Sequence, residues 1–437
     1  MNRNLALWSI AVGLGGFLFG LDTAVISGAE QDIQKLWSLS DFYHGLAVAM
    51  ALYGTIVGAA FGGIPADRYG RKPTLLWIGL LFFVSAIGAA VAPEEYSFMF
   101  FRFIGGLSIG ASSVVAPVYI SEIAPPAYRG RLVIAFQFNI VLGILIAYVS
   151  NYLLEGIGGE NDWRWMLGVV AVPSLLFSLA ILFTPETPRW LVLNRGDEAA
   201  ARAIIAQSRP DTDAAIEEIR ASASGSPASE SVFGLKFRTP VVLAILFAFF
   251  NQVSGINAVI YFAPRIFEMT GLGKEAALLS TAGIGIANLI ATIMGWYLID
   301  RVGRRALMYI GTAGYLVSLG LIAWSFFSES YANVPLYTFI FIGAHAIGQG
   351  SVIWVFISEI FPNGVRASGM ALGSLTHWIF AAVIANVFPF FANTFGGGPV
   401  FAFFFIAMLF QLLYVMRMMP ETKGVSLEEL QNRLIKD

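Results

Sequence analysis

A single carboxylate lies in the first long apolar segment of this 437-residue chain. The segment from Leu5 to Gly28 contains Asp22 and no lysine or arginine. An aspartate at the centre of a membrane helix costs about 2.5 to 3.5 kcal/mol on insertion scales, so it normally has a partner and faces a polar space. Arg102 lies inside the fourth apolar segment and is the natural candidate for that partner.

Asp22 and Arg102 are expected at the same depth, because each lies about six residues, roughly 9 Å, from the outer end of its helix. Desolvation and a neighbouring arginine act in opposite directions on the protonation of a carboxyl group. The pair can therefore bind and release a proton as its surroundings change, which an asparagine at position 22 would abolish. The alternative is a permanent ion pair that only joins two helices.

A second polar stretch follows 235 positions later, where Gly255–Ile260 nearly repeats Gly20–Ile26 with Asn257 in the place of Asp22. Carboxamides both donate and accept hydrogen bonds, as a neutral polyol ligand requires, and aromatic rings can stack on a sugar. The candidate residues are Gln137, Asn251, Gln252, Asn257, Asn288, Trp354 and Trp378. The alternative is that the amides only join helices.

Charged motifs repeat at one set of segment ends. Asp67–Lys72 matches Asp300–Arg305, and Ser121–Pro125 matches Ser358–Pro362. They predict a charge latch, a set of ion pairs between helices that closes the cytoplasmic side and opens once per cycle. The alternative is that the basic residues only anchor the helix ends on the cytoplasmic side. Its members are Asp67, Arg71, Glu122, Arg129, Asp300, Arg304, Glu359 and Arg366.

The three histidines predict no metal site. His44 is expected at an outer loop and without a role. His345 and His377 lie in apolar segments, where a lone histidine is typically a hydrogen-bonded packing residue. The sequence also has no nucleophile elbow, phosphate loop or HExxH motif. We therefore expect no enzymatic activity and no cofactor.

The composition predicts an all-α integral membrane protein, because 57% of the residues are hydrophobic and only 12% charged, against about 25% charged in soluble domains. A net charge of −2 gives no reason to expect nucleic acid, and the absence of cysteine excludes disulfides. Twelve apolar segments of 18 or more residues are expected as bilayer-spanning helices. They run over Leu5–Gly28, Gly45–Ala66, Leu75–Ala92, Phe98–Ile120, Leu132–Leu154, Trp165–Phe183, Val241–Ile266, Ala276–Ile299, Leu307–Phe327, Pro335–Ile357, Met370–Phe391 and Val400–Met418.

The basic residues predict the orientation. With both termini in the cytoplasm, 21 of the 26 lysines and arginines fall on the inner side. The outer side has four, Lys35, Arg164, Arg265 and Lys274. This is a strong positive-inside signal, so we expect a multi-pass protein of the cell membrane with cytoplasmic ends.

The repeated motifs, at offsets of 233 to 237 residues, divide the chain into two six-helix repeats, a hallmark of one class of secondary transporter. We predict six-helix bundles over 1–184 and 239–419, a cytoplasmic loop over 185–238 and a cytoplasmic tail over 420–437. Within the loop, Glu198–Ser208 and Ala214–Ala221 are expected as short amphipathic helices, and Ser222–Ser231 as a flexible linker.

These motifs resemble the sugar porters of the major facilitator superfamily over essentially the whole chain. The specific marks are Gly63–Lys72, Arg102–Gly106, Pro185–Arg189, Gln252–Pro264, Asp300–Arg305 and Pro420–Gly424. The resemblance implies alternating access with one sugar per cycle. It implies sugar contacts for Gln137, Gln252, Asn257, Asn288 and Trp354, and wall positions for Phe19 and Trp378.

The resemblance also implies that Asp22 and Arg102 couple transport to protons, as in the bacterial sugar–proton symporters, since passive glucose facilitators have asparagine at the first position. Asn251 replaces a usual glutamine, His377 a usual glutamine or asparagine, and His345 a usual aromatic residue. His377 is therefore also expected to bind the sugar, where a histidine could add its own pH dependence. Ala346 replaces the usual acid, which leaves Asp22 as the coupling group.

We therefore expect a proton-coupled monosaccharide symporter, for a hexose or a pentose, that functions as a monomer in the lipid bilayer. A passive facilitator of the same fold is the nearest alternative. A sugar sensor is a further one, although such sensors tend to have long cytoplasmic tails and only 18 residues follow Met419. A drug–proton antiporter would call for a more acidic and aromatic cavity.

Overall fold

A computed structural model describes residues 3–207, 211–224, 231–362, 364–425 and 427–435. Within them the regular structure is helical, and twelve spans are long and apolar enough to cross a membrane. The predicted all-α membrane fold is confirmed. The spans are Arg3–Leu36, Asp41–Phe61, Arg71–Ala90, Glu95–Ile123, Ile134–Leu154, Gly159–Leu182, Leu235–Glu268, Lys274–Val302, Arg304–Phe327, Val334–Ile360, Arg366–Phe395 and Gly397–Arg417.

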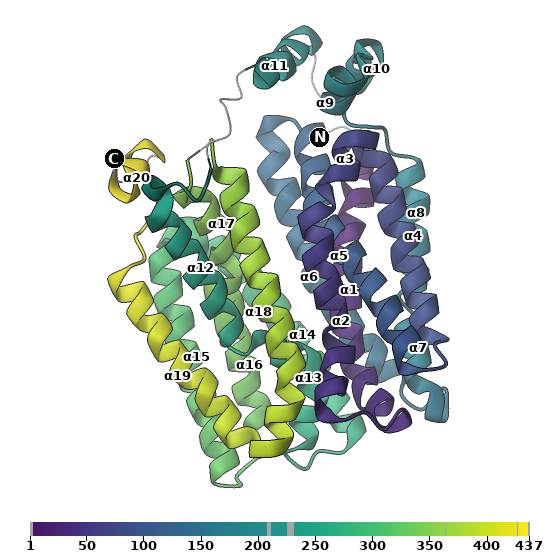
Figure 1. Cartoon of the computed structure of the whole chain (residues 1–437), viewed down its shortest axis with the longest axis vertical. Helices are drawn as coiled ribbons and strands as arrows, with labels where there is room; N and C mark the ends of the chain where they lie inside the picture. The colour runs from purple at the N-terminus through teal and green to yellow at the C-terminus, as the bar shows by residue number, and fades with distance from the viewer. Residues whose placement is uncertain (1–2, 208–210, 225–230, 363, 426, 436–437) are drawn as a thin grey trace. The chain divides into compact units, whose positions relative to one another are not determined.

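The first of two compact units comprises Met1–Val25, Met50–Ser150 and Gly156–Ala228. Figure 1 shows its α9 and α10 at the same end as α3 and the N-terminus. Its helices are α1 (Arg3–Leu36) as far as Val25, most of α2 (Asp41–Phe61) and α6 (Pro126–Leu154), α3 (Gly63–Tyr69), α4 (Arg71–Ala90), α5 (Glu95–Ile123), η1 (Gly159–Asn161), α7 (Asp162–Gly168), α8 (Ala171–Leu182), α9 (Pro188–Trp190), η2 (Leu191–Arg195), α10 (Glu198–Ile205) and α11 (Thr212–Ser224).

The second unit comprises Ile26–Ala49, Asn151–Glu155 and Ser229–Asp437, and so includes the last turns of α1 and α6 and the first turns of α2. Because these units follow packing rather than the repeat, the predicted boundaries at 184, 238 and 419 stay predictions. The remaining helices are η3 (Leu235–Phe237), α12 (Arg238–Val253), α13 (Ile256–Glu268), α14 (Lys274–Val302), α15 (Arg304–Phe327), α16 (Val334–His345), η4 (Ala346–Gly350), α17 (Ser351–Ile360), α18 (Arg366–Phe395), α19 (Gly397–Arg417) and α20 (Leu427–Leu434).

Glycines let α2 and α5 approach closely in the first unit. A Cβ on Gly106 would lie 1.9 Å from the carbonyl oxygen of Ala51, and one on Gly58 would lie 2.3 Å from that of Leu107. Small residues at membrane-helix interfaces allow such backbone contact. The glycine spacing in α2 and α5 is therefore a packing feature.

The predicted helix Val241–Ile266 is wrong in its continuity. α12 and α13 are separated at Gly255, whose φ of 87° is in the left-handed region. A Cβ at this position would also lie 2.6 Å from Cδ2 of Phe404, so both the backbone and the packing require glycine. Discontinuous helices are typical of binding sites in secondary transporters.

Two further irregularities lie in the second unit. Phe262 in α13 has φ −125° and ψ 20°, two residues before Pro264, which lacks an N–H and kinks a helix. The predicted tenth segment divides into α16, a π-helical turn at Ala346–Gly350 and α17. Such π turns occur often at functional sites.

The segment after α8 has its own small core. Both predicted amphipathic helices are present as α10 and α11. The predicted flexible linker Ser222–Ser231 lies largely outside the described residues. The indole N–H of Trp190 donates to the Asp67 carbonyl over 2.9 Å and fixes this segment to the first unit. Its buried core consists of Trp190, Leu191, Val192, Ala201, Ile205, Ala215 and Ile216.

Candidate functional site

Asp22 and Arg102 form a buried ion pair in the first unit. Nη1 of Arg102 donates to Oδ1 of Asp22 over 2.9 Å, and Nη2 donates to the Asp22 carbonyl over 3.2 Å. The residues are only 2% and 1% exposed. Oδ2 of Asp22 is buried and has no hydrogen-bond partner within the described part of the chain. One carboxylate oxygen is thus bonded to arginine, and the other makes no hydrogen bond within the described residues.

The ion pair predicted for these residues is present, but the depth estimate behind it is wrong. α1 continues to Leu36, 14 residues past Asp22, whereas Arg102 lies seven residues after the start of α5 at Glu95. The polar turns after Gly28 stay helical because their side chains have partners on other helices of the second unit, described below.

The predicted amides of the second unit form a hydrogen-bonded cluster at the break between α12 and α13. Nε2 of Gln252 donates to Oδ1 of Asn251 over 2.8 Å, and Oε1 of Gln252 accepts from Nδ2 of Asn257 over 2.6 Å. The ring nitrogens of His377 on α18 lie 3.1 and 3.2 Å from the same Nε2. Gln252 is therefore the centre of the cluster, and His377 helps to orient it.

Aromatic rings adjoin this cluster. The His377 ring lies 5.2 Å from Trp354 on α17 and 4.8 Å from Trp378 on α18, measured between ring centres. Asn288 on α14 is half-buried, and its Oδ1 accepts from Thr292 over 3.4 Å. The second unit thus brings His377 and Trp354 together with the amides.

The other two predicted sugar residues belong to the first unit. Phe19 on α1 and Gln137 on α6 are both half-buried. A neighbouring polar contact holds these helices together, since Nδ2 of Asn139 donates to the Gly13 carbonyl over 3.1 Å. Their role in binding stays a prediction.

His345 lies in a separate polar network of the second unit. Its Nδ1 is 2.5 Å from the hydroxyl of Tyr315, which donates to Oε1 of Gln349 over 2.9 Å. Gln349 bonds to Gln411, which donates to Thr312 over 2.7 Å. This is the hydrogen-bonded packing role expected of His345. Within the described residues no cluster of His, Cys, Asp and Glu could hold a metal ion.

The first charge network joins α4, α5 and the segment after α8. Arg71 pairs with Glu122 over 3.0 Å and with Asp67 over 3.2 Å. The hydroxyl of Thr187 donates to the other oxygen of Glu122 over 2.6 Å. Glu186 accepts from the backbone N–H groups of Arg71 and the next residue, each over 3.1 Å.

The second unit repeats this network. Arg304 pairs with Glu359 over 2.8 Å and with Asp300 over 3.0 Å, and Thr422 donates to Glu359 over 2.6 Å. Glu421 accepts from the backbone N–H of Arg304 over 3.0 Å. The repeated Pro-Glu-Thr of the sequence was the signal for the threonines and the glutamates, which our latch prediction left out.

The pKa values of the two networks' glutamates shift in opposite directions. Burial raises the pKa of Glu186 above its ordinary value and outweighs the bonds from backbone N–H groups. Burial also acts on Glu421, which is more exposed, but there the backbone N–H groups prevail and lower the pKa. Gly70 and Gly303, with φ of 108° and 105°, present the N–H groups to these carboxylates.

The remaining two predicted latch residues do not join these pairs in the described structure. Nε of Arg366 donates to the Phe361 carbonyl over 3.3 Å, and its Nη2 is buried without a hydrogen-bond partner in the described part of the chain. The side chain of Arg129 lies outside the described residues. Each described network joins helices of one unit.

Sequence reasoning missed a third charged cluster, in the second unit. Glu30 on α1 is bonded by Arg265 on α13 through two contacts of 2.9 and 3.1 Å, and Nε2 of His44 on α2 lies 2.7 Å from the same carboxylate. Glu30 and His44 are fully buried. The expectation that His44 lies in a loop is therefore wrong, because α2 begins at Asp41.

Comparison with known proteins identifies the family. The model described as "Sugar (and other) transporter" matches residues 8–434. The arabinose-proton symporter of Bacillus subtilis is 37% identical over 98% of this chain and 95% of its own length. The glucose transporter GlcP of Staphylococcus epidermidis is 34% identical over 99% of this chain and 98% of its own.

The structure is similar to a solved transporter. The inward-open conformation of the xylose transporter XylE from E. coli superimposes with a TM-score of 0.88 and 30% identity, covering 98% of this chain and 100% of that one. These matches cover nearly the whole length of this chain and of each protein compared with it. The chain therefore belongs to the sugar transporter family of the major facilitator superfamily, a family of multi-pass membrane transporters rather than enzymes.

Proposed function

We propose that this protein is a secondary transporter that moves a monosaccharide together with a proton by alternating access. The observation that carries the proposal is the buried Asp22–Arg102 pair with one carboxylate oxygen unbonded in the described part of the chain. The similarity to an arabinose-proton symporter supports proton coupling. A hexose or a pentose is the substrate, since relatives named for arabinose and glucose are about equally similar.

Asp22 is the proton-binding group and Arg102 sets its affinity. While Arg102 bonds to Oδ1, the carboxylate stays ionised, because its charge is compensated in a buried place. When the helices rearrange and the bond lengthens, the carboxylate is left buried and binds a proton at Oδ2. Return of the arginine expels the proton, so one cycle carries one proton across.

The sugar is bound by the amides at the α12–α13 break. The cluster centred on Gln252 offers donors and acceptors without a net charge, which suits hydroxyl groups and rejects ions. Trp354 provides an aromatic face beside it. Asn288, Gln137 and the wall residues Phe19 and Trp378 complete the set in this proposal.

We place both termini in the cytoplasm of a bacterial cell and the protein in the cell membrane as a functional monomer. The 21 basic residues assigned to the inner side support the orientation. The two Arg–Glu networks then lie at the cytoplasmic ends of the helices. There they fix the helices of each half and contribute to closing the inner side.

The test is uptake of labelled glucose, galactose, xylose and arabinose into proteoliposomes, with and without an inward proton gradient. Wild type should accumulate one sugar only with the gradient. Asp22→Asn should equilibrate that sugar without accumulation, because an amide does not titrate. Glu94→Gln, which removes an exposed carboxylate, is the matched control and should behave as wild type.

A passive facilitator is the second candidate, favoured by the two hydrogen bonds that make the Asp22–Arg102 pair a stable contact between helices. In that case wild type and Asp22→Asn would both equilibrate sugar at similar rates, and symport would be refuted. A sensor would bind the sugar without any uptake.

A further inference from the structure

The cluster of Glu30, His44 and Arg265 contains three ionisable groups that the proposed proton–sugar cycle does not use. They come from three helices of the second unit, α1, α2 and α13. Glu30 and His44 are fully buried and the Arg265 side chain is only 12% exposed. Burial of three such groups is costly unless their charges balance, so the balance of charge decides what the cluster can do.

In this structure the charges balance between Glu30 and Arg265 alone. The guanidinium donates from Nε and Nη2 to the two carboxylate oxygens, a bidentate pair that compensates one negative with one positive charge. A protonated His44 would add an uncompensated positive charge. Both ring nitrogens of His44 are buried without a hydrogen bond of good geometry among the described residues, although Nε2 lies 2.7 Å from the Glu30 carboxylate.

Other charged groups surround the cluster, and Asp41 and Glu268 both interact electrostatically with Arg265. Asp41 on α2 is reached through Gln34, whose Nε2 donates to Oδ1 of Asp41 over 3.1 Å and whose Oε1 accepts from Arg265 over 2.5 Å. Lys274 on α14 pairs with Asp32 and with Glu155, each over 3.0 Å. The remaining charged groups at this end are Lys35 on α1 and Glu268 on α13.

The cluster adjoins the kink in α13. The His44 ring packs edge-on against Phe262, with 6.0 Å between ring centres, and Phe262 is the non-helical residue of the α13 kink. Gln34 and Glu30 both bond to Arg265 one turn further on. α13 is therefore held to α1 and α2 mainly at the segment that a bend at Phe262 would displace.

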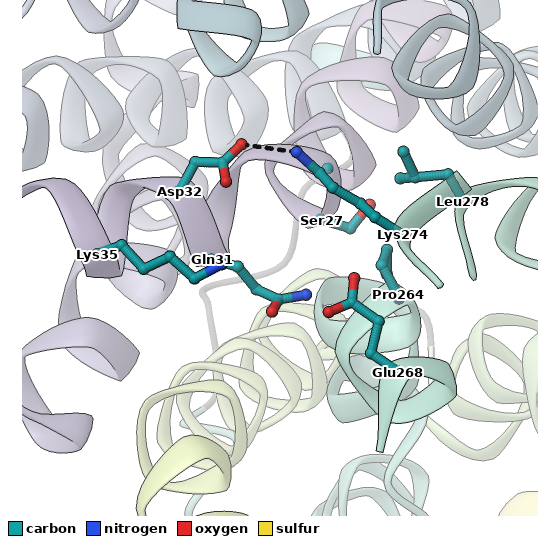
Figure 2. A pocket seen from close by; sticks show the side chains of 9 residues that line it. Ser27, Gln31, Asp32, Lys35, Pro264, Glu268, Lys274 and Leu278 are labelled. Carbon is teal, nitrogen blue, oxygen red and sulfur yellow. Dashed lines mark hydrogen bonds and ion pairs between the residues drawn. The ribbon is translucent and has the colours of Figure 1, made fainter. Parts of the chain in front are cut away.

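A small cavity lies near the cluster and is lined by residues adjacent to Glu30 and Arg265 in the chain. It measures about 20 Å³, enough for one water molecule. Figure 2 shows Gln31 from α1 and Glu268 from α13 pointing toward one another across it, with the Asp32–Lys274 pair alongside. Gln31 follows Glu30 in the chain, and Glu268 lies one turn after Arg265. The cavity is thus lined within about one helical turn, along the chain, of both members of the ion pair.

We propose that Glu30, His44 and Arg265 form a second proton-binding site, in which His44 takes up a proton when movement of α13 withdraws Arg265 from Glu30. The protonated imidazole then replaces the guanidinium as the counter-charge of Glu30. This inference rests on the proposed transport function, in which the outer end of these helices must open. External acid therefore favours opening of that end, separately from any proton on Asp22.

The absence of cysteine from the chain allows a direct test. Ser27 is 2% exposed and lines the cavity, so Ser27→Cys reports opening through its reaction with a membrane-impermeant thiol reagent. Leu36→Cys, at a position 53% exposed at the end of α1, corrects for the pH dependence of the reagent itself. Both are made in Asp22→Asn, which removes the other proton site, and no sugar is present.

The labelling ratio of Ser27→Cys to Leu36→Cys should rise as external pH falls from 7.5 to 5.5. One linked proton permits at most about a tenfold rise per pH unit. His44→Gln should make the ratio independent of pH, since its amide still donates to Glu30 but does not titrate. Tyr43→Gln, at an exposed neighbouring position, should leave the rise unchanged.

Glu30→Gln provides a second variant should His44→Gln fail to fold. It removes the charge that a protonated His44 would compensate, so it should also flatten the ratio. A ratio that does not rise in the His44 protein, or that rises equally in His44→Gln or Glu30→Gln, overturns the proposal. Because the labelling needs no sugar, its failure is distinct from a failure of sugar uptake, which would refute the transport function.

Discussion

His377 provides the sharpest prediction about sugar affinity. Its ring lies 3.1 Å from Nε2 of Gln252 and can accept a hydrogen bond only while one ring nitrogen carries no proton. Burial disfavours the charged imidazole, so we expect His377 to stay neutral between pH 5 and 8 and to keep its bond to Gln252. Sugar affinity should then not change with pH through this residue.

Two substitutions separate the effect of the His377–Gln252 hydrogen bond from any effect of protonating His377. His377→Gln restores an acceptor that does not titrate, so transport should persist with the pH profile of affinity unchanged. His377→Leu removes the acceptor altogether. Loss of a neutral hydrogen bond costs about 0.5 to 1.5 kcal/mol, so KM should rise roughly 2- to 12-fold at pH 7.5 and show little further change in acid.

The assay is sugar counterflow in proteoliposomes with equal pH on both sides, from pH 5 to 8, in the Asp22→Asn background. Counterflow needs no net proton movement, so the change in KM reports the sugar site. His345→Gln is the matched control, since it alters a histidine bonded to Tyr315 and not to Gln252. Loss of transport in His377→Gln, or an affinity that falls in acid in the His377 protein and not in His377→Gln, would refute this reasoning.

Two further predictions concern stability, measured as thermal unfolding in detergent. Gly106→Ala should destabilise the protein by about 1 to 3 kcal/mol, because its Cβ would lie 1.9 Å from the carbonyl oxygen of Ala51. Gly63→Ala is the control and should be neutral, because a Cβ there would have no atom within 4 Å. Equal stability of the two variants would contradict the described packing. The lowered pKa of Glu421 means that its ionised form adds stability at neutral pH, lost as pH falls through 4.5 and below. Glu421→Gln should therefore lower stability at pH 7 and make stability fall less in acid. Glu186→Gln, at a group with a raised pKa, should not lower stability at pH 7. The opposite order of the two variants would show that the pKa directions are wrong.

The pairing of Asp22 with Arg102 could be predicted because an isolated charge in an apolar helix has few possible partners. The Arg71–Glu122 and Arg304–Glu359 pairs could be predicted for a different reason, since the same motif occurs twice at nearly the same spacing. In both cases charged residues are rare in the apolar segments around them. The few charges of opposite sign then limit which ion pairs the fold can form.

The cluster at Glu30 could not be predicted in this way. The residues after Gly28 are polar, and a polar stretch after an apolar one is normally a loop. Only contacts distant in sequence, such as those of Arg265 with Glu30, explain why α1 continues to Leu36. Likewise the break at Gly255 depends on the Phe404 ring against it, and a single glycine in an apolar run is by itself compatible with a continuous helix.

The two carboxylates of α1 give this helix a central position in the proposed mechanism. Asp22 is paired in the first unit and Glu30 in the second, while the helix between them is unbroken. Eight residues correspond to about 12 Å along the axis and about 80° around it, so the side chains face different neighbours. Because a continuous helix transmits rotation and tilt, a movement that withdraws one carboxylate from its arginine also changes the position of the other. In the two proposals, proton uptake by Asp22 and proton uptake by His44 beside Glu30 therefore both depend on the position of α1.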